Sequence, residues 1–139
     1  MLDFSTIAIE PELAQEGVWV PFMGAEFKVA RPGPAYQARL VELAKEHWDL
    51  INSKTDEGNA KAVEITRKAY AELVLRDWRN VGDKGVEMAY STDLAFALLC
   101  DPRQQEFHDF LDRVVNNRSN YQTKVDAEIA ESVKSSAVS

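Results

Sequence analysis

Residues 55–78 read TDEGNAKAVEITRKAYAELVLRDW, and this stretch decides the fold class. Thr55 opens a helix, and the two acids that follow it lie near the positive end of the helix dipole. Gly58 weakens the first turn. Apolar residues then recur at helical spacing along one wide face, which comprises Val63, Ala69, Tyr70, Leu73, Val74 and Trp78. The stretch therefore predicts a long amphipathic helix with Tyr70 and Trp78 in the core.

Helical patterns flank this stretch on both sides. A helix is expected from Pro34 to about Asn52, since Tyr36, Leu40, Leu43, Ala44, His47 and Ile51 recur at helical spacing. Ser91 can cap a short helix that carries Leu94, Ala95, Leu98 and Leu99. Asp101 and Pro102 form a strong start signal for a last helix that extends to about Val133.

The N-terminal part has a different pattern. Residues 18–22 and 26–30 are rich in strand formers, and Gly24 supplies a positive φ between them. They predict a short hairpin, preceded by one helical turn that starts at Pro11 and ends near Gly17. We therefore expect a mainly α, four-helix small domain with a short N-terminal β-hairpin. This single domain spans 1–139, with the N-terminal segment and hairpin at 1–33, helices at 34–133 and a flexible tail at 134–139.

Composition and charge exclude several classes of function. The net charge of −7 argues against a nucleic-acid binder, because phosphate backbones require clustered Lys and Arg. One cysteine, Cys100, permits no intrachain disulfide. The start has no basic region of a signal peptide, and no apolar run approaches the roughly 20 residues of a membrane span. We expect a cytoplasmic protein that binds neither nucleic acid nor membrane.

The residues that could carry chemistry do not assemble into a site. His108 and Asp112 lie one helical turn apart, but a metal site needs three or four ligands and the second histidine is His47. Glu42 and Glu46 near His47 lack a second Glu-x-x-His pattern that would complete a bundle site. The acid next to Cys100 disfavours a nucleophilic thiolate. The sequence therefore predicts no catalytic, cofactor-binding or metal-binding residue, and a protein that is not an enzyme.

The last helix offers candidates for binding another protein. Its first part has the broad core-facing stripe of Phe107, Phe110, Leu111, Val114 and Val115, and a wholly polar block follows at 116–120. Beyond this block only a narrow stripe of Tyr121, Val125, Ile129 and Val133 is strongly apolar. Continuous helix would run about 45–50 Å, longer than a domain this size is wide. The far end would then protrude, bend back at the asparagines, pack on another chain or fray. We predict a contact with another chain, with Trp48 as a further anchor if it is exposed.

The chain also resembles the tail assembly chaperones of long-tailed bacteriophages. The resemblance runs from about Asp3 to Tyr121 and depends on the order and spacing of several short motifs. They are Gly17-Val-Trp19, Ala25-Glu-Phe-Lys-Val-Ala30, Ala71-Glu-Leu-Val-Leu-Arg-Asp-Trp-Arg-Asn-Val81, Gly85, Tyr90-Ser91 and Leu98-Leu99-x-Asp101. The chain departs from the usual pattern at Ala89, where many relatives have proline, and at Arg79, where they have an acid.

This resemblance implies a function and a set of partners. Such chaperones bind the tape-measure protein, keep it soluble, help recruit tail-tube subunits and leave before the tail is finished. The chain is then expected in the host cytoplasm and not in the mature virion, with the tape-measure protein, the tail-tube protein and a second copy of itself as possible partners. The alternative is a structural virion protein, such as a head–tail connector or minor tail subunit.

Overall fold

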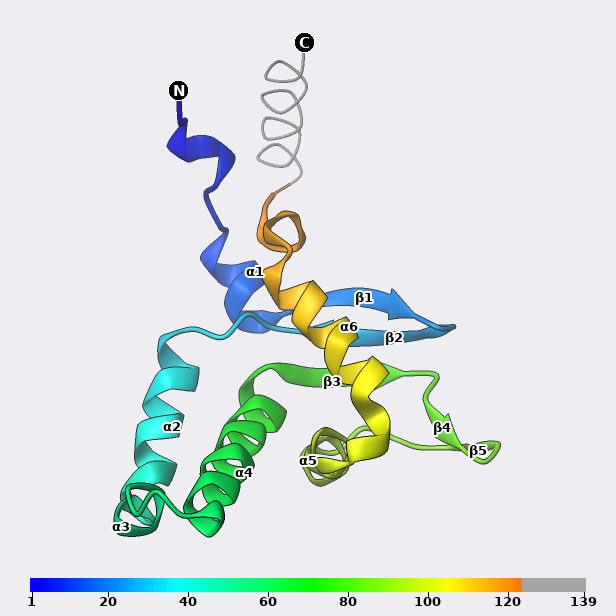
Figure 1. Cartoon of the computed structure of the whole chain (residues 1–139). Helices are drawn as coiled ribbons and strands as arrows, with labels where there is room; N and C mark the ends of the chain where they lie inside the picture. Colours follow the sequence, from blue (N-terminus) through cyan, green and yellow to red (C-terminus); the bar gives the residue numbers. More distant parts are fainter. Residues whose placement is uncertain (124–139) are drawn as a thin grey trace.

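The computed structural model describes residues 1–123, in which six α-helices accompany a three-stranded antiparallel sheet (Figure 1). The helices are α1 (Pro11–Glu16), α2 (Pro34–Lys45), α3 (Trp48–Ile51), α4 (Asp56–Leu73), α5 (Thr92–Cys100) and α6 (Gln105–Asn116). The sheet contains β1 (Val18–Phe22), β2 (Ala25–Val29) and β3 (Leu75–Arg79), and a second sheet pairs β4 (Gly82–Asp83) with β5 (Val86–Glu87). Single 3-10 turns are η1 (Phe4–Thr6), η2 (Pro102–Gln104) and η3 (Arg118–Tyr121). The fold is therefore mixed α/β, and the expected four-helix, mainly α domain is wrong in this respect.

The predicted hairpin is confirmed as β1 and β2. Met23 and Gly24 connect the strands with φ values of 50° and 84°, the left-handed pair that a two-residue hairpin turn requires. Along β2, Ala25, Phe27 and Val29 are buried, and Glu26 between them is exposed. One face of the hairpin therefore belongs to the core, as the alternation of its residues indicated.

The predicted long helix ends earlier than expected. Its start is as expected, because the Thr55 hydroxyl accepts a hydrogen bond from the Gly58 N–H. However, α4 stops at Leu73, and the next residues form β3, which pairs with β2. Trp78 is buried, as predicted, but it reaches the core from a strand and not from a helical face.

A bulge explains why this strand has the apolar spacing of a helix. Leu75 and Trp78 are three residues apart, yet they pair with Val29 and Phe27, which are only two apart. The register shift between Lys28 and Val29 accommodates one extra residue on β3. Both apolar side chains of β3 therefore face the core, although the spacing in the sequence was typical of a helix.

The helix expected at 34–52 is also divided. Its first part, α2, ends at Lys45, and the chain turns at His47 into the short α3. This turn brings α3 against the start of α4, where a Cβ at Gly58 would overlap the carbonyl oxygen of Leu50. In this arrangement α2 and α4 lie side by side below the sheet (Figure 1).

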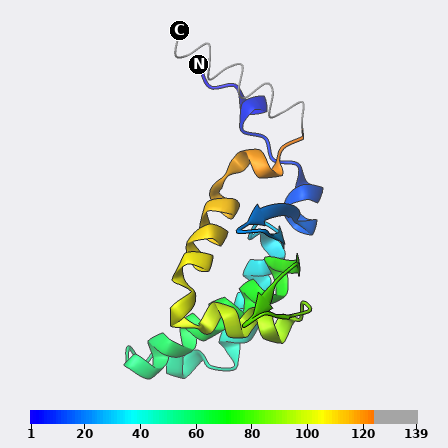
Figure 2. The ribbon, with the colours of Figure 1, turned by 90° about the vertical axis from the view of Figure 1, so that its right-hand side faces the viewer.

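The predicted amphipathic stripe of α6 is confirmed, and it covers one face of the sheet (Figure 2). The ring centroids of Phe27 and Phe107 are 4.9 Å apart, and Phe22 stacks on Phe110 at 4.3 Å. The Trp78 indole N–H donates to the carbonyl of Met88 at 2.8 Å, so its polar atom is satisfied inside the core. These aromatic contacts between helix and hairpin form the centre of the domain.

The chain bends at the asparagine block instead of continuing as a helix. The backbone of Asn117 is extended, and its side chain accepts from the Ser119 N–H. Asn120 donates from its side-chain amide to the carbonyl of Val114, which is one of the last acceptors of α6. The expected helix from Pro102 to Val133 is therefore wrong, because asparagine side chains satisfy the backbone groups at which a helix ends.

Candidate partner-binding surfaces

Trp48 lies on α3 with 60% of its surface exposed, which makes it available as a binding anchor. Of the other two tryptophans, Trp78 is buried, and the indole of Trp19 lies under the guanidinium of Arg79 at 3.7 Å. Tryptophan side chains are enriched in the hot spots of protein interfaces. Trp48 is therefore exposed, which is the condition that the sequence analysis set for its role as a binding anchor.

Tyr121 belongs to the core of its own chain. Its side chain is fully buried, and its hydroxyl donates to the carbonyl of Val29 on β2 at 3.2 Å. The expectation that Tyr121 contacts a partner is therefore corrected, because a buried side chain presents no surface to another protein. Val125, Ile129 and Val133, the other members of the predicted stripe, lie outside the described residues.

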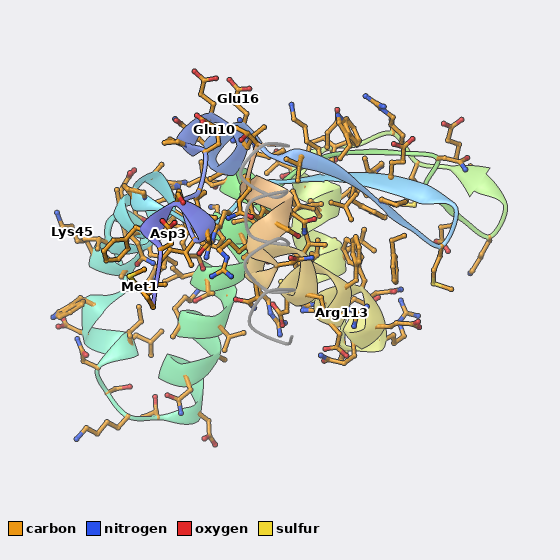
Figure 3. The ribbon with its side chains drawn as sticks, turned by 90° about the horizontal axis from the view of Figure 1, so that it is seen from above. Met1, Asp3, Glu10, Glu16, Lys45 and Arg113 are labelled. Atoms are coloured by element: carbon orange, nitrogen blue, oxygen red, sulfur yellow. The ribbon has the colours of Figure 1, made fainter. Side chains whose placement is uncertain are left out.

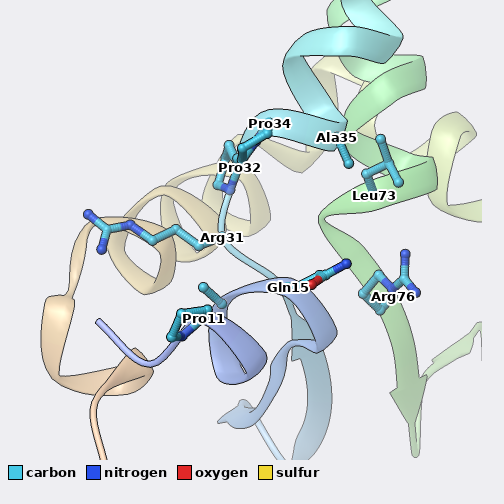
Figure 4. Close-up of a pocket in the computed structure, with 10 residues that line it drawn as sticks. Pro11, Gln15, Arg31, Pro32, Pro34, Ala35, Leu73 and Arg76 are labelled. Carbon is cyan, nitrogen blue, oxygen red and sulfur yellow. The ribbon is translucent and has the colours of Figure 1, made fainter. Parts of the chain in front are cut away.

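A groove of about 550 Å³ lies where α1, the loop before α2 and the junction of α4 with β3 meet (Figure 4). Pro11, Ala14 and Gln15 line it from α1, residues 31–35 line it from the loop and the first turn of α2, and Leu73 and Arg76 line it from the junction. In Figure 4, Arg31 and Arg76 lie at opposite ends, with Gln15 and the prolines between them. We call it the Arg31–Arg76 groove.

Backbone hydrogen bonds hold the walls of the groove together. The Arg31 N–H donates to the carbonyl of Ala14 at 2.7 Å and so ties the loop to α1. The neighbouring Ala30 N–H donates to the carbonyl of Val74 at 2.8 Å and ties the same loop to the end of α4. Gly17 ends α1 with a φ of 97°, and a Cβ there would lie 3.0 Å from the Ala30 nitrogen. The groove is consequently a preformed feature of the fold.

Neither arginine of the groove forms an ion pair with a carboxylate in the described part of the chain. The carboxylate nearest along α4 is Glu72, but Arg39 binds it with Nε at 2.8 Å and an Nη at 3.2 Å. This contact raises the pKa of Arg39. Arg76 therefore reaches only the backbone carbonyl of Glu72, at 3.4 Å, and Arg31 has no ion pair within residues 1–123.

Comparison with known proteins identifies the family. Residues 31–135 match the family model described as YdaY prophage protein, and this match covers most of the chain. The chain belongs to the YdaY prophage protein family. This membership confirms the expected phage origin. Comparisons of this YdaY protein with curated proteins and with solved structures gave no match.

The matched region of this YdaY protein begins at Arg31 and includes Arg76, so both charged ends of the groove lie within it. Pro11, Ala14 and Gln15, which line the groove from α1, precede the match. Sequence reasoning did not find this groove. The available signals were the prolines at 32 and 34 and two arginines in an acidic chain, but no pattern in the sequence places residue 31 near residue 76.

His108 was considered above as a possible metal ligand. It lines a smaller pocket of about 180 Å³ between α4, α5 and α6. His108 and Asp112 border it together, as their one-turn spacing predicted, and Tyr70 borders it from α4. Burial and the charge of Asp112 raise the pKa of the Tyr70 hydroxyl. Over residues 1–123, no three side chains of His, Cys, Asp or Glu come together as a metal would require, and no helix is long and apolar enough to cross a membrane.

Proposed function

We propose that this YdaY-family protein is a phage tail assembly chaperone that binds the tape-measure protein. Membership of a prophage family carries the proposal, because it provides the phage context that the resemblance to tail assembly chaperones requires. The order of the short motifs from Gly17 to Asp101 then favours this role among phage proteins. We propose a non-enzymatic role, in which the chain keeps the tape-measure protein soluble and helps recruit tail-tube subunits in the host cytoplasm.

The exposed surface of the domain suits such a role. Trp48 and Val41, on α3 and α2, are 60% and 57% exposed, and both can bury apolar surface against a partner. A net charge of −7 keeps the chaperone itself soluble while it carries an aggregation-prone client. Burial of a few such side chains contributes roughly 1.5–3 kcal/mol each before the cost of association, which supports reversible binding.

Co-expression with the tape-measure protein of the same prophage tests this function. We expect a larger soluble fraction of the tape-measure protein and co-purification of the two chains. An unrelated acidic protein of similar size and charge serves as the control for non-specific solubilisation. The proposal is wrong if neither solubility nor co-purification exceeds this control.

The composition of purified virions separates the proposed function from its main rival. A chaperone should be present in lysates of induced cells and absent from purified particles when both are analysed by mass spectrometry. Detection in particles at a fixed copy number would instead identify a structural virion protein.

A further inference from the structure

The Arg31–Arg76 groove has a charge pattern opposite to that of the chain as a whole. The sequence contains 23 acidic and 16 basic residues, yet the ten described residues that line the groove include two arginines and no acid. In Figure 3, Glu16 at the end of α1 points away from the body of the molecule. The groove is thus a local site for negative charge on an acidic protein.

Neither guanidinium group forms an ion pair with a carboxylate of residues 1–123. Glu72 is held by Arg39, so the one hydrogen bond of the Arg76 side chain within residues 1–123 is the 3.4 Å contact to the backbone carbonyl of Glu72. Arg31 makes no ion pair with any described residue, and its own backbone is fixed to α1 through the carbonyl of Ala14. Arginine binds carboxylates through two parallel N–H donors, a geometry that a water-exposed guanidinium can still offer.

The space between the arginines favours an apolar ligand. Its walls are three proline rings together with Ala14, Ala35 and Leu73. Proline has a fixed φ, so these walls lose little further conformational freedom when a ligand binds. The volume of about 550 Å³ falls within the range of pockets that bind small ligands or a few side chains.

We propose that the Arg31–Arg76 groove binds a short apolar segment of the tape-measure protein that carries a carboxylate side chain. This inference rests on the proposed function for the identity of the partner, and on charge complementarity for the chemistry of the segment. The apolar side chains of the segment lie against the prolines and Leu73, and its carboxylate accepts hydrogen bonds from Arg31 or Arg76. The ion pair at the exposed rim makes binding sensitive to salt, which suits a client that is later released.

Binding of synthetic peptides tests the groove directly. Overlapping peptides that cover the tape-measure protein of the same prophage are titrated against the full-length chain, with fluorescence anisotropy as the readout. We expect binding only by apolar peptides that contain Asp or Glu, and weaker binding as the ionic strength rises. Replacement of the peptide carboxylate by its amide should lower the affinity roughly 10-fold or more.

Paired arginine variants distinguish the groove from general electrostatics. The double variant Arg31→Ala, Arg76→Ala should weaken binding roughly 10- to 100-fold. The control Arg113→Ala, Arg118→Ala removes the same charge from exposed positions outside the groove and should change the affinity less than about 2-fold. For the peptide whose carboxylate is replaced by an amide, the groove variant should lower the affinity little further. The replacement in the peptide and the two arginine substitutions remove the same contact. Equal effects of the two double variants, or full additivity with the amide peptide, would refute the proposal.

Photo-crosslinking identifies the occupant in the complete protein. Ala35 is exposed at the groove, and p-benzoylphenylalanine in its place should crosslink to the co-expressed tape-measure protein. Crosslinks to a second copy, or to residues beyond Thr123 of the same chain, would overturn the proposed occupant. If the wild-type chain and the groove variant co-purify equally well with full-length tape-measure protein, the groove proposal fails while the chaperone function stands. If the wild-type chain fails to co-purify at all, the chaperone function itself is wrong.

Discussion

Replacement of Gly58 by alanine should destabilise the domain, although alanine is the better helix former. Gly58 is buried in the first turn of α4, where the chain of α3 passes very close. A Cβ at this position would overlap the carbonyl oxygen of Leu50 and lie 3.0 Å from the Ser53 hydroxyl. The Ser53 hydroxyl already donates to that carbonyl at 2.6 Å, so neither group can move away independently.

Two opposing terms decide the sign of this effect. Alanine gains at most about 0.5–1 kcal/mol over glycine from helix propensity and a less flexible unfolded chain. Against this, α3 must shift away from α4, and Ile51 at its end packs against the small cluster of Leu43, Ile65 and Ala69. Forced displacement of packed elements costs roughly 1–3 kcal/mol. We therefore expect Gly58→Ala to lower the free energy of unfolding by about 0.5–2 kcal/mol.

Urea unfolding followed by circular dichroism measures this change. Asn59→Ala is the matched control, because residue 59 is exposed on the same turn and gains helix propensity without a steric overlap. The control should be slightly more stable than the wild type, and Gly58→Ala clearly less stable, with unchanged m-values. A Gly58→Ala variant as stable as Asn59→Ala would refute the close approach of α3 to α4.

Further outcomes follow from the aromatic residues. Trp78→Ala should lower the unfolding free energy by about 3–5 kcal/mol in the same assay, since the side chain is 5% exposed and hydrogen-bonded. Trp48→Ala should leave that free energy within about 0.5 kcal/mol but reduce co-purification of the tape-measure protein; unchanged co-purification would remove Trp48 from the interface. Tyr121→Phe loses the bond to the Val29 carbonyl and should cost about 0.5–1.5 kcal/mol. Burial raises the pKa of Tyr121 to about 12 and also raises that of Tyr70, so the folded state holds these protons more tightly than the unfolded chain. Stability should be unaffected below about pH 10 and fall between about pH 10 and 12, whereas a flat profile there would contradict their burial.

Elements with a local chemical signature could be predicted from the sequence. Gly24 between two runs of strand formers gave the correct hairpin, and Gly17 the correct end of the turn that starts at Pro11. Ser91 caps α5 by accepting from the Leu94 N–H, as its position before an apolar helix suggested. In each case one residue type satisfies a backbone requirement that its neighbours impose, so distant parts of the chain were not needed.

Elements that depend on distant partners could not be predicted in this way. The apolar spacing of Leu75 and Trp78 fits a helix as well as a bulged strand, and only the free edge of β2 decides between them. The asparagines at 117 and 120 show a similar ambiguity, since they are tolerated in an exposed helix but here terminate it. Tyr121 was consequently predicted to contact a partner protein. In the structure the bend places it against β2 of its own chain, where its hydroxyl donates to the Val29 carbonyl.

The transition from helix α4 to strand β3 determines the charge of the Arg31–Arg76 groove. Had α4 continued to Trp78, Glu72 and Arg76 would be a plain i, i+4 pair on one helix face. Instead, α4 ends at Leu73, and the carbonyl of Val74, which caps this end, accepts a hydrogen bond from the Ala30 N–H in the loop before α2. Arg39 of α2 takes the carboxylate of Glu72, and Arg76 faces the groove without it. The unpaired charge on which the proposed recognition rests is therefore a consequence of the helix-to-strand transition, so a helix-stabilising variant at this transition should disturb ligand binding as well as the sheet.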